Sequence, residues 1–157
     1  MCTGIAVHWR DIPETLIERD RLQDRVVVRG ENADREFRFL YRDAQARLPV
    51  WLDGELTICT WGNRDDKQSR LPRTGWCRQE SLQAGRWSWL APRPVVIPAC
   101  YGLERGVWFQ IKEGLSGIVV QDERDEAHVY MLTEAASHYY QVMTRHDRMP
   151  ILIGERI

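Results

Sequence analysis

The chain contains many short runs in which apolar and polar residues alternate, or in which β-branched and aromatic residues cluster. In Glu36–Tyr41 apolar and polar residues alternate, which predicts a strand with one buried face. Runs of these kinds predict further strands at Ile5–Val7, Arg25–Arg29, Pro49–Leu52, Leu56–Trp61, Pro94–Ile97, Val107–Lys112, Gly117–Gln121, His128–Leu132 and Ile151–Ile153.

Helical signals are fewer than strand signals. Asp11 followed by Pro13 has the pattern of an N-cap and an early helical proline, which predicts a helix to about Gln23. Glu134–Met143 predicts a second, short helix. The segment Gly62–Arg93 is polar and irregular, and loops of this length in a compact domain are often functional.

Together these elements predict an α+β fold. A chain of 157 residues has the size of one domain, so we expect a single domain over residues 1–157. The number of predicted strands favours a mostly antiparallel sheet that curls towards a barrel, with a few short helices.

The composition is that of an ordinary globular protein, with 43% hydrophobic and 29% charged residues. No apolar run approaches the roughly 20 residues that a membrane helix needs. The first residues lack the apolar core of a signal peptide. These observations favour a cytoplasmic protein.

The cysteines and histidines do not form a metal-binding pattern. None of the cysteines belongs to a C-x-x-C pair, and the histidines do not fall at zinc-ligand spacings. We therefore expect free thiols, no metal and no cofactor. The four cysteines are Cys2, Cys59, Cys77 and Cys100.

The positive charge is carried almost entirely by arginine. The net charge is −1, but of 22 basic residues only Lys67 and Lys112 are lysines. Guanidinium groups suit phosphates and stack on bases, which is typical of nucleic-acid binding. A GC-rich genome that favours arginine codons explains the same bias, and the sequence leaves both interpretations open.

Cys2 is the strongest candidate for covalent chemistry. Methionine aminopeptidase removes Met1 when the next side chain is small, and the product would carry an α-amine and a thiol on adjacent carbons. A model α-amine has a pKa of about 7.7–8.0, so a useful fraction is unprotonated at neutral pH. With an aldehyde, the amine gives an imine and the thiol then closes a stable five-membered thiazolidine.

Two further segments stand out. Pro98–Glu104 is a turn-like stretch with the pattern P-A-x-x-x-x-E, and His146–Pro150 reads H-x-R-M-P before an apolar run. Together with Met1-Cys2, in this order, the three segments resemble the signatures of the SRAP family, the SOS-response-associated peptidases that react with abasic sites in DNA. The resemblance spans almost the whole chain, as a short and divergent member.

The resemblance implies a fold, a mechanism and a partner. The fold would be SRAP-like, and the partner would be single-stranded DNA with an abasic site, whose ring-opened sugar exposes an aldehyde. Cys2 would form a thiazolidine crosslink that shields the lesion, as part of the SOS response to DNA damage. Glu104 matches the glutamate that orients the amine, and His146 matches the general acid/base. An autoproteolytic cysteine peptidase activity is also implied.

Several residues are candidates for binding DNA. Trp76-Cys77-Arg78-Gln79-Glu80 matches the family segment N-A-R-x-E at its arginine and glutamate, with Trp76 where an asparagine contacts the active site and DNA. We expect Arg78, Trp76 and Arg148 to contact the DNA strand. Arg148 is the arginine of H-x-R-M-P.

Arg86 and Trp87 add a second possible DNA contact. They belong to a stretch of the long loop in which basic and aromatic residues interleave, continuing with Trp89 and Arg93. A base stacked on such a ring would gain roughly 1–3 kcal/mol. Alternatively, Trp87 and Trp89 form one face of a strand that packs into the core.

Two other functions remain open at this level. An N-terminal cysteine is also the nucleophile of glutamine amidotransferases and other N-terminal-nucleophile hydrolases, where its amine serves as the base. Met1–Ile5 resembles their opening as well. The third possibility is a non-catalytic relic of the family that binds nucleic acid without crosslinking it.

Overall fold

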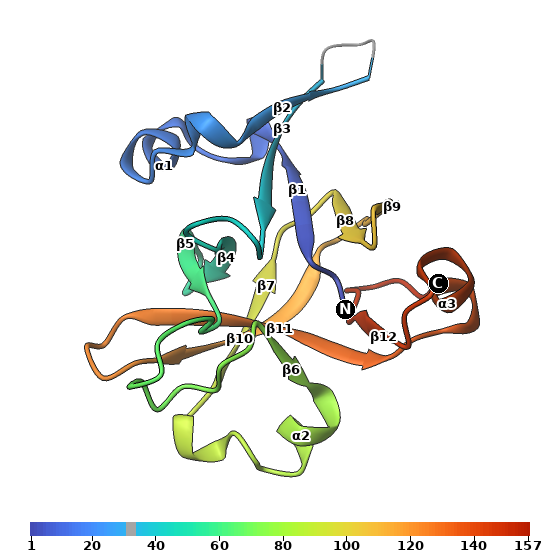
Figure 1. Ribbon diagram of the computed structural model, residues 1–157. Coiled ribbons are helices and arrows are strands. Elements are labelled where there is room, and N and C mark those ends of the chain that lie inside the picture. Colours follow the sequence, from blue (N-terminus) through green and yellow to red (C-terminus); the bar gives the residue numbers. More distant parts are fainter. Residues whose placement is uncertain (31–33) are drawn as a thin grey trace.

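The computed structural model describes residues 1–30 and 34–157, which contain two β-sheets (Figure 1). The two sheets share one hydrophobic core. All pairings in the first sheet are antiparallel. Its strands, in spatial order, are β2 (Val26–Arg29), β3 (Asp34–Leu40), β1 (Gly4–His8), β8 (Tyr101–Glu104) and β9 (Val107–Gln110).

The second sheet closes on itself. Its strands, in order, are β10 (Leu115–Gln121), β7 (Arg93–Ile97), β4 (Arg47–Leu52), β5 (Glu55–Trp61), β11 (Ala127–Ala135) and β12 (Arg148–Pro150). Because β10 also pairs with β11, the strands from β10 to β11 form a closed five-stranded barrel. A barrel leaves no free edge along these strands. The predicted fold class, α+β with mostly antiparallel sheet curled into a barrel, is confirmed.

The helix predicted over Asp11–Gln23 is broken into short pieces. Asp11 does not cap it: Pro13 occupies the N-cap position, and no side chain caps this turn. Arg21 has a φ of 53°, a left-handed conformation that ends the helical path. The pieces are the 3₁₀ turn η1 (Trp9–Asp11), the helix α1 (Glu14–Arg19) and the 3₁₀ turn η2 (Leu22–Arg25).

The helix predicted over Glu134–Met143 begins later, as α3 (His138–Thr144). The preceding residues up to Ala135 continue β11, because they pair with β12. The Ser137 hydroxyl then accepts the backbone N–H of Tyr140 at 3.1 Å and caps α3.

Two further positions differ from the prediction. The last strand is β12, so Ile151–Ile153 is not a strand, and only Leu152 forms an isolated bridge there. The segment with the P-A-x-x-x-x-E pattern is not simply a turn, since its last four residues form β8, of which Tyr101–Leu103 pair with β1. In β8, a Cβ at Gly102 would lie 2.4 Å from the Phe109 ring, so glycine is required for this close packing.

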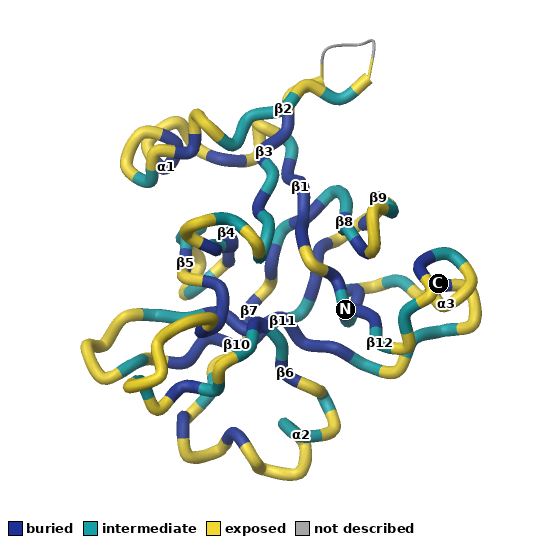
Figure 2. The backbone as a smooth tube through the Cα atoms, in the orientation of Figure 1, coloured by how far each residue is buried: buried dark blue, intermediate teal, exposed yellow. Residues whose placement is uncertain are grey.

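The long segment Gly62–Arg93 is not a loop throughout. It contains β6 (Trp76–Arg78), which runs parallel to β11, the helix α2 (Gln79–Gln83) and the turn η3 (Ser88–Leu90). Its apolar side chains cover one face of β10 and β11, opposite the main core, and Figure 2 shows buried stretches within it. This second cluster comprises Leu71, Cys77, Trp87, Leu90, Ile118, Val120, Tyr130 and Leu132.

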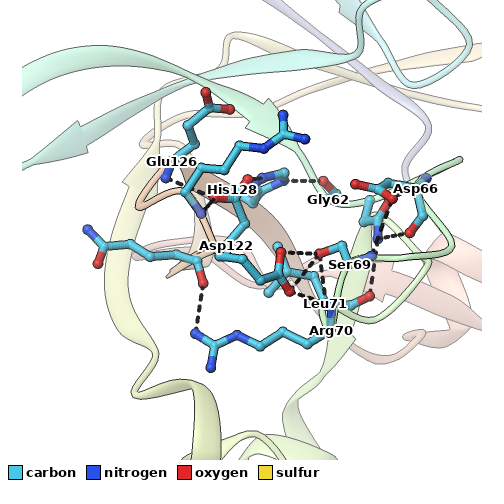
Figure 3. Close-up of polar contacts among 12 residues, drawn as sticks. Gly62, Asp66, Ser69, Arg70, Leu71, Asp122, Glu126 and His128 are labelled. Atoms are coloured by element: carbon cyan, nitrogen blue, oxygen red, sulfur yellow. Dashed lines mark hydrogen bonds and ion pairs between the residues drawn. The ribbon is translucent and has the colours of Figure 1, made fainter.

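His128 fastens the start of this segment to the barrel (Figure 3). Its Nδ1 lies 2.7 Å from the Gly62 carbonyl oxygen, and its Nε2 lies 2.9 Å from the Asp122 carboxylate. Burial of Asp122 opposes its ionisation, but the hydrogen bonds from His128 and from two backbone amides prevail and lower its pKa. Nearby, the backbone N–H of Arg70 donates to Glu123.

We expect His128→Ala to lower the free energy of unfolding by about 1–4 kcal/mol, because it removes the ring's contacts with the Gly62 carbonyl and the Asp122 carboxylate. These contacts are two hydrogen bonds when the ring carries both protons and one when it is neutral. Chemical denaturation measures this change. His138→Ala, an exposed histidine on α3, is the control and should stay within about 0.5 kcal/mol of wild type. Equal stability of the two variants would show that the bridge contributes nothing.

Candidate functional site

The N-terminal segment is held between two strands of the first sheet. The Thr3 N–H donates to the Leu103 carbonyl at 2.8 Å, and the Thr3 carbonyl accepts the Tyr41 N–H at 3.0 Å. A Cβ at Gly4 would lie 2.5 Å from Cδ2 of Leu40, so a larger residue there would displace the Leu40 side chain. These contacts fix the backbone on the C-terminal side of Cys2.

Cys2 itself is fully buried when Met1 is present. Its thiol donates to the Gly4 carbonyl with Sγ and O 3.1 Å apart. Burial raises the pKa of the Cys2 thiol to about 11. The candidate nucleophile is therefore protonated and covered in the chain that retains Met1.

Glu104, the last residue of β8, faces the N-terminus. Its Oε1 accepts the Met1 ammonium at 3.1 Å, while its Oε2 is buried without a hydrogen-bond partner. The carboxylate is only 2% exposed. Burial lowers the pKa of the Met1 amine, although the hydrogen bond to Glu104 opposes this effect. An amine at this position is therefore easier to deprotonate than an amine in water.

His146 follows α3 and lies at the same pocket as Met1 and Glu104. Its Nδ1 lies 3.0 Å from the Arg148 backbone nitrogen, whose N–H donates to it. Nδ1 also lies 3.2 Å from the Arg148 carbonyl oxygen, but we take the shorter contact with the N–H as the hydrogen bond and assign the proton of the neutral ring to Nε2. The Nε2–H is then the ring's donor for a bound molecule.

A pocket of about 790 Å³ joins these groups. This volume is within the usual range of small-molecule sites. Its charged lining residues, apart from His146, are three arginines and one glutamate, so the surroundings favour an anionic ligand. The lining residues are Met1, Thr3, Leu40, Tyr41, Arg42, Arg64, Leu103, Glu104, Arg105, Gly106 and His146.

Trp76 holds Cys2 from the other side. Its indole Nε1–H donates to the Cys2 carbonyl at 2.9 Å. The ring packs against Tyr41 and Trp61, with centroid distances of 4.6 and 5.8 Å. Trp76 therefore contacts the candidate nucleophile through a hydrogen-bond donor, and β6 positions it there by pairing with β11.

The other residues predicted to bind DNA lie elsewhere. Arg78 and Arg86 are exposed. Arg148 forms an ion pair with Glu80 at 3.0 Å and donates to the Thr133 carbonyl at 2.9 Å, so its guanidinium already has partners within the protein.

Trp87 does not present its ring for base stacking. It is 8% exposed in the second cluster and meets Tyr130 edge to face, with centroids 4.9 Å apart. The core interpretation is therefore correct for Trp87. It is wrong for Trp89, which is 56% exposed.

Sequence reasoning missed the arginines around the pocket and the buried Tyr140. Arg105 donates to the Arg145 carbonyl at 2.7 Å and so ties the turn after β8 to the residue before His146. Arg64 donates to three backbone carbonyls of the connection between β3 and β4. The one available signal was the position of Arg105 directly after Glu104.

Comparisons with known proteins do not assign the chain to a family. No protein-family model matches it, and a search of curated proteins finds no matching sequence. Among the described residues, no three histidine, cysteine or acidic side chains are arranged to hold a metal ion. The described helices are all too short or too polar to cross a membrane.

Proposed function

We propose that this protein, once Met1 is removed, captures the aldehyde of an abasic site in single-stranded DNA as a thiazolidine on Cys2. One observation carries this function: the N-terminal segment, Glu104 and His146, which are far apart in the sequence, meet at one pocket. The motif resemblance singled out Cys2, Glu104 and His146. Of these, Glu104 and His146 line the pocket, and Met1 and Thr3 line it on either side of the buried Cys2.

Capture begins at the amine of Cys2. Glu104 accepts a proton from the ammonium, and the free amine attacks the aldehyde carbon to form a C–N bond. The resulting hydroxyl is protonated through His146 with the proton that Glu104 took up, and it leaves as water. The nitrogen then loses its remaining proton to solvent, which gives the imine and leaves Glu104 again as a carboxylate. The thiol then adds across the C=N bond: sulfur bonds to carbon, and its proton ends on nitrogen. One water leaves in all, and nothing is oxidised.

The charges around the pocket support a DNA partner. Arg42 and Arg105 are exposed at its edge, beside the site where the sugar would react. Phosphates on either side of an abasic sugar match such forked donors. Arg78 and Arg86 are exposed and can extend the contact with the strand.

Trp76 supports the same function in a different way. It holds the Cys2 carbonyl and so limits the positions that the aminothiol can adopt. We place this activity in the cytoplasm, where the four free thiols would persist. Autoproteolytic removal of N-terminal residues belongs to the same proposal, because it would use the same cysteine.

The test is a denaturing gel of protein incubated with a single-stranded oligonucleotide that contains one abasic site. We expect a heat-stable shifted band with wild type, and none with Cys2→Ala or with an undamaged oligonucleotide. Mass spectrometry must first show that Met1 is absent. No band from correctly processed protein would reject abasic-site capture, and glutaminase activity in the same preparation would favour an amidotransferase.

A further inference from the structure

Two buried side chains that interact electrostatically with Cys2 each have one polar atom without a hydrogen-bond partner in the described structure. These atoms are the Tyr140 hydroxyl on α3 and Oε2 of Glu104 on β8. One is a donor and the other an acceptor. A buried hydroxyl without a partner destabilises the folded state, so its presence requires an explanation.

Tyr140 is held firmly in place. It is fully buried in the main core cluster that also contains Cys2, and its ring meets Phe109 edge to face with centroids 5.4 Å apart. The Ser137 cap fixes the turn of α3 that carries it. A phenylalanine at this position would pack equally well. Packing therefore does not explain the Tyr140 hydroxyl.

We propose that Tyr140 is a further catalytic residue of this site, whose hydroxyl donates a hydrogen bond to the Cys2 sulfur during ring closure. This inference rests on the proposed function. In that step the S–H bond breaks and an S–C bond forms, while the imine nitrogen takes up the proton. Tyr140 stabilises the negative charge that develops on sulfur, and Glu104 Oε2 is the free acceptor that passes the proton on.

The surroundings suit Tyr140 as a donor and not as a base. Burial raises its pKa well above the ordinary value, and the charges of Cys2 and Glu104 add to this effect. A contact with the Thr144 side chain opposes it, but this contact lacks the geometry of a hydrogen bond. The hydroxyl therefore keeps its proton throughout the neutral range. The Cys2 thiol needs such a donor, because burial disfavours its ionisation.

The experiment compares Tyr140→Phe with wild type and with Tyr139→Phe, all prepared without Met1. Tyr139 is the neighbouring residue on α3 and is 61% exposed, so it is a matched control for the loss of a phenol hydroxyl. Three quantities are measured: the melting temperature, the pH midpoint of Cys2 alkylation followed by peptide mass spectrometry, and the rate of thiazolidine formation with formaldehyde and with abasic DNA.

For Tyr140→Phe we expect an unchanged or higher melting temperature and an alkylation midpoint at least about one pH unit higher. Both thiazolidine rates should fall about tenfold or more, because a hydrogen bond to a charged group is lost. Tyr139→Phe should match wild type. A Tyr140→Phe protein with the wild-type midpoint and rates would overturn the role of Tyr140, whatever its melting temperature.

The two aldehydes separate this inference from the proposed function. If wild type reacts with formaldehyde in a Tyr140-dependent way but not with abasic DNA, DNA capture fails and the role of Tyr140 stands. If wild type crosslinks abasic DNA and Tyr140→Phe does so at the same rate, only the role of Tyr140 fails.

Discussion

Protein that retains Met1 should form no detectable crosslink with abasic DNA, a loss of at least about a thousandfold relative to processed protein. The retained residue separates the free amine from the thiol, so the 1,2-aminothiol does not exist. Cys2 is also fully buried, and a pKa of about 11 leaves about one thiolate in ten thousand at pH 7. Protein made under inhibition of methionine aminopeptidase, checked by intact mass, tests this expectation.

The control is the same preparation after treatment with purified methionine aminopeptidase. Removal of Met1 should restore crosslinking in proportion to the processed fraction. Crosslinking by fully unprocessed protein would mean that another nucleophile reacts, and Cys100 would be the first to test because it is partly exposed.

Glu104→Gln should lower the crosslinking rate by about a hundredfold or more, the usual contribution of a general acid or base. Glutamine keeps the shape of the side chain but cannot accept the proton of the Cys2 ammonium. The variant should be at least as stable as wild type, because it removes a buried charge that has one oxygen without a partner. Single-turnover kinetics and thermal unfolding measure the two effects.

Glu14→Gln, at an exposed position on α1, provides the matched control and should react at the wild-type rate. If Glu104→Gln crosslinked as fast as this control, Glu104 would have only a structural role. A slower reaction that accompanied a lower melting temperature would point to the same conclusion.

The strands could be predicted because alternation reports directly which face of a strand is buried. Glu36–Tyr41 was recognised in this way and largely coincides with β3. β8 was not recognised, because Gly102 interrupts its pattern, and the glycine is there to admit the Phe109 ring. The break of the first helix depends on the left-handed conformation of Arg21, for which the local sequence gives no signal.

Trp87 and Trp89 show why sequence spacing alone does not predict which side chains are buried. Residues two positions apart on a strand lie on the same face, and the core interpretation assumed that Trp87 and Trp89 belong to such a strand. In the structure Trp89 lies in the 3₁₀ turn η3 and Trp87 just before it, so the two rings point to different environments. One is buried and the other exposed for that reason.

Some residues of the candidate site could be predicted from the sequence, and others could not. Cys2, Glu104 and His146 could be named from motifs, since each lies in a segment with a recognisable pattern. Tyr140 and Arg42 could not, because they come from a helix and a strand connection whose approach to Cys2 depends on how the two sheets pack. No local pattern encodes that long-range arrangement.

The anchoring of the first residues has a consequence for the chemistry. Chain termini are usually among the most mobile parts of a domain, yet here the backbone after Cys2 is hydrogen-bonded on both sides. The entropy of placing the nucleophile is thus lost during folding, before any ligand binds. The reactivity of Cys2 is then linked to the local stability of β1. Local unfolding of this one strand would abolish the proposed reaction of Cys2 while the barrel stays folded.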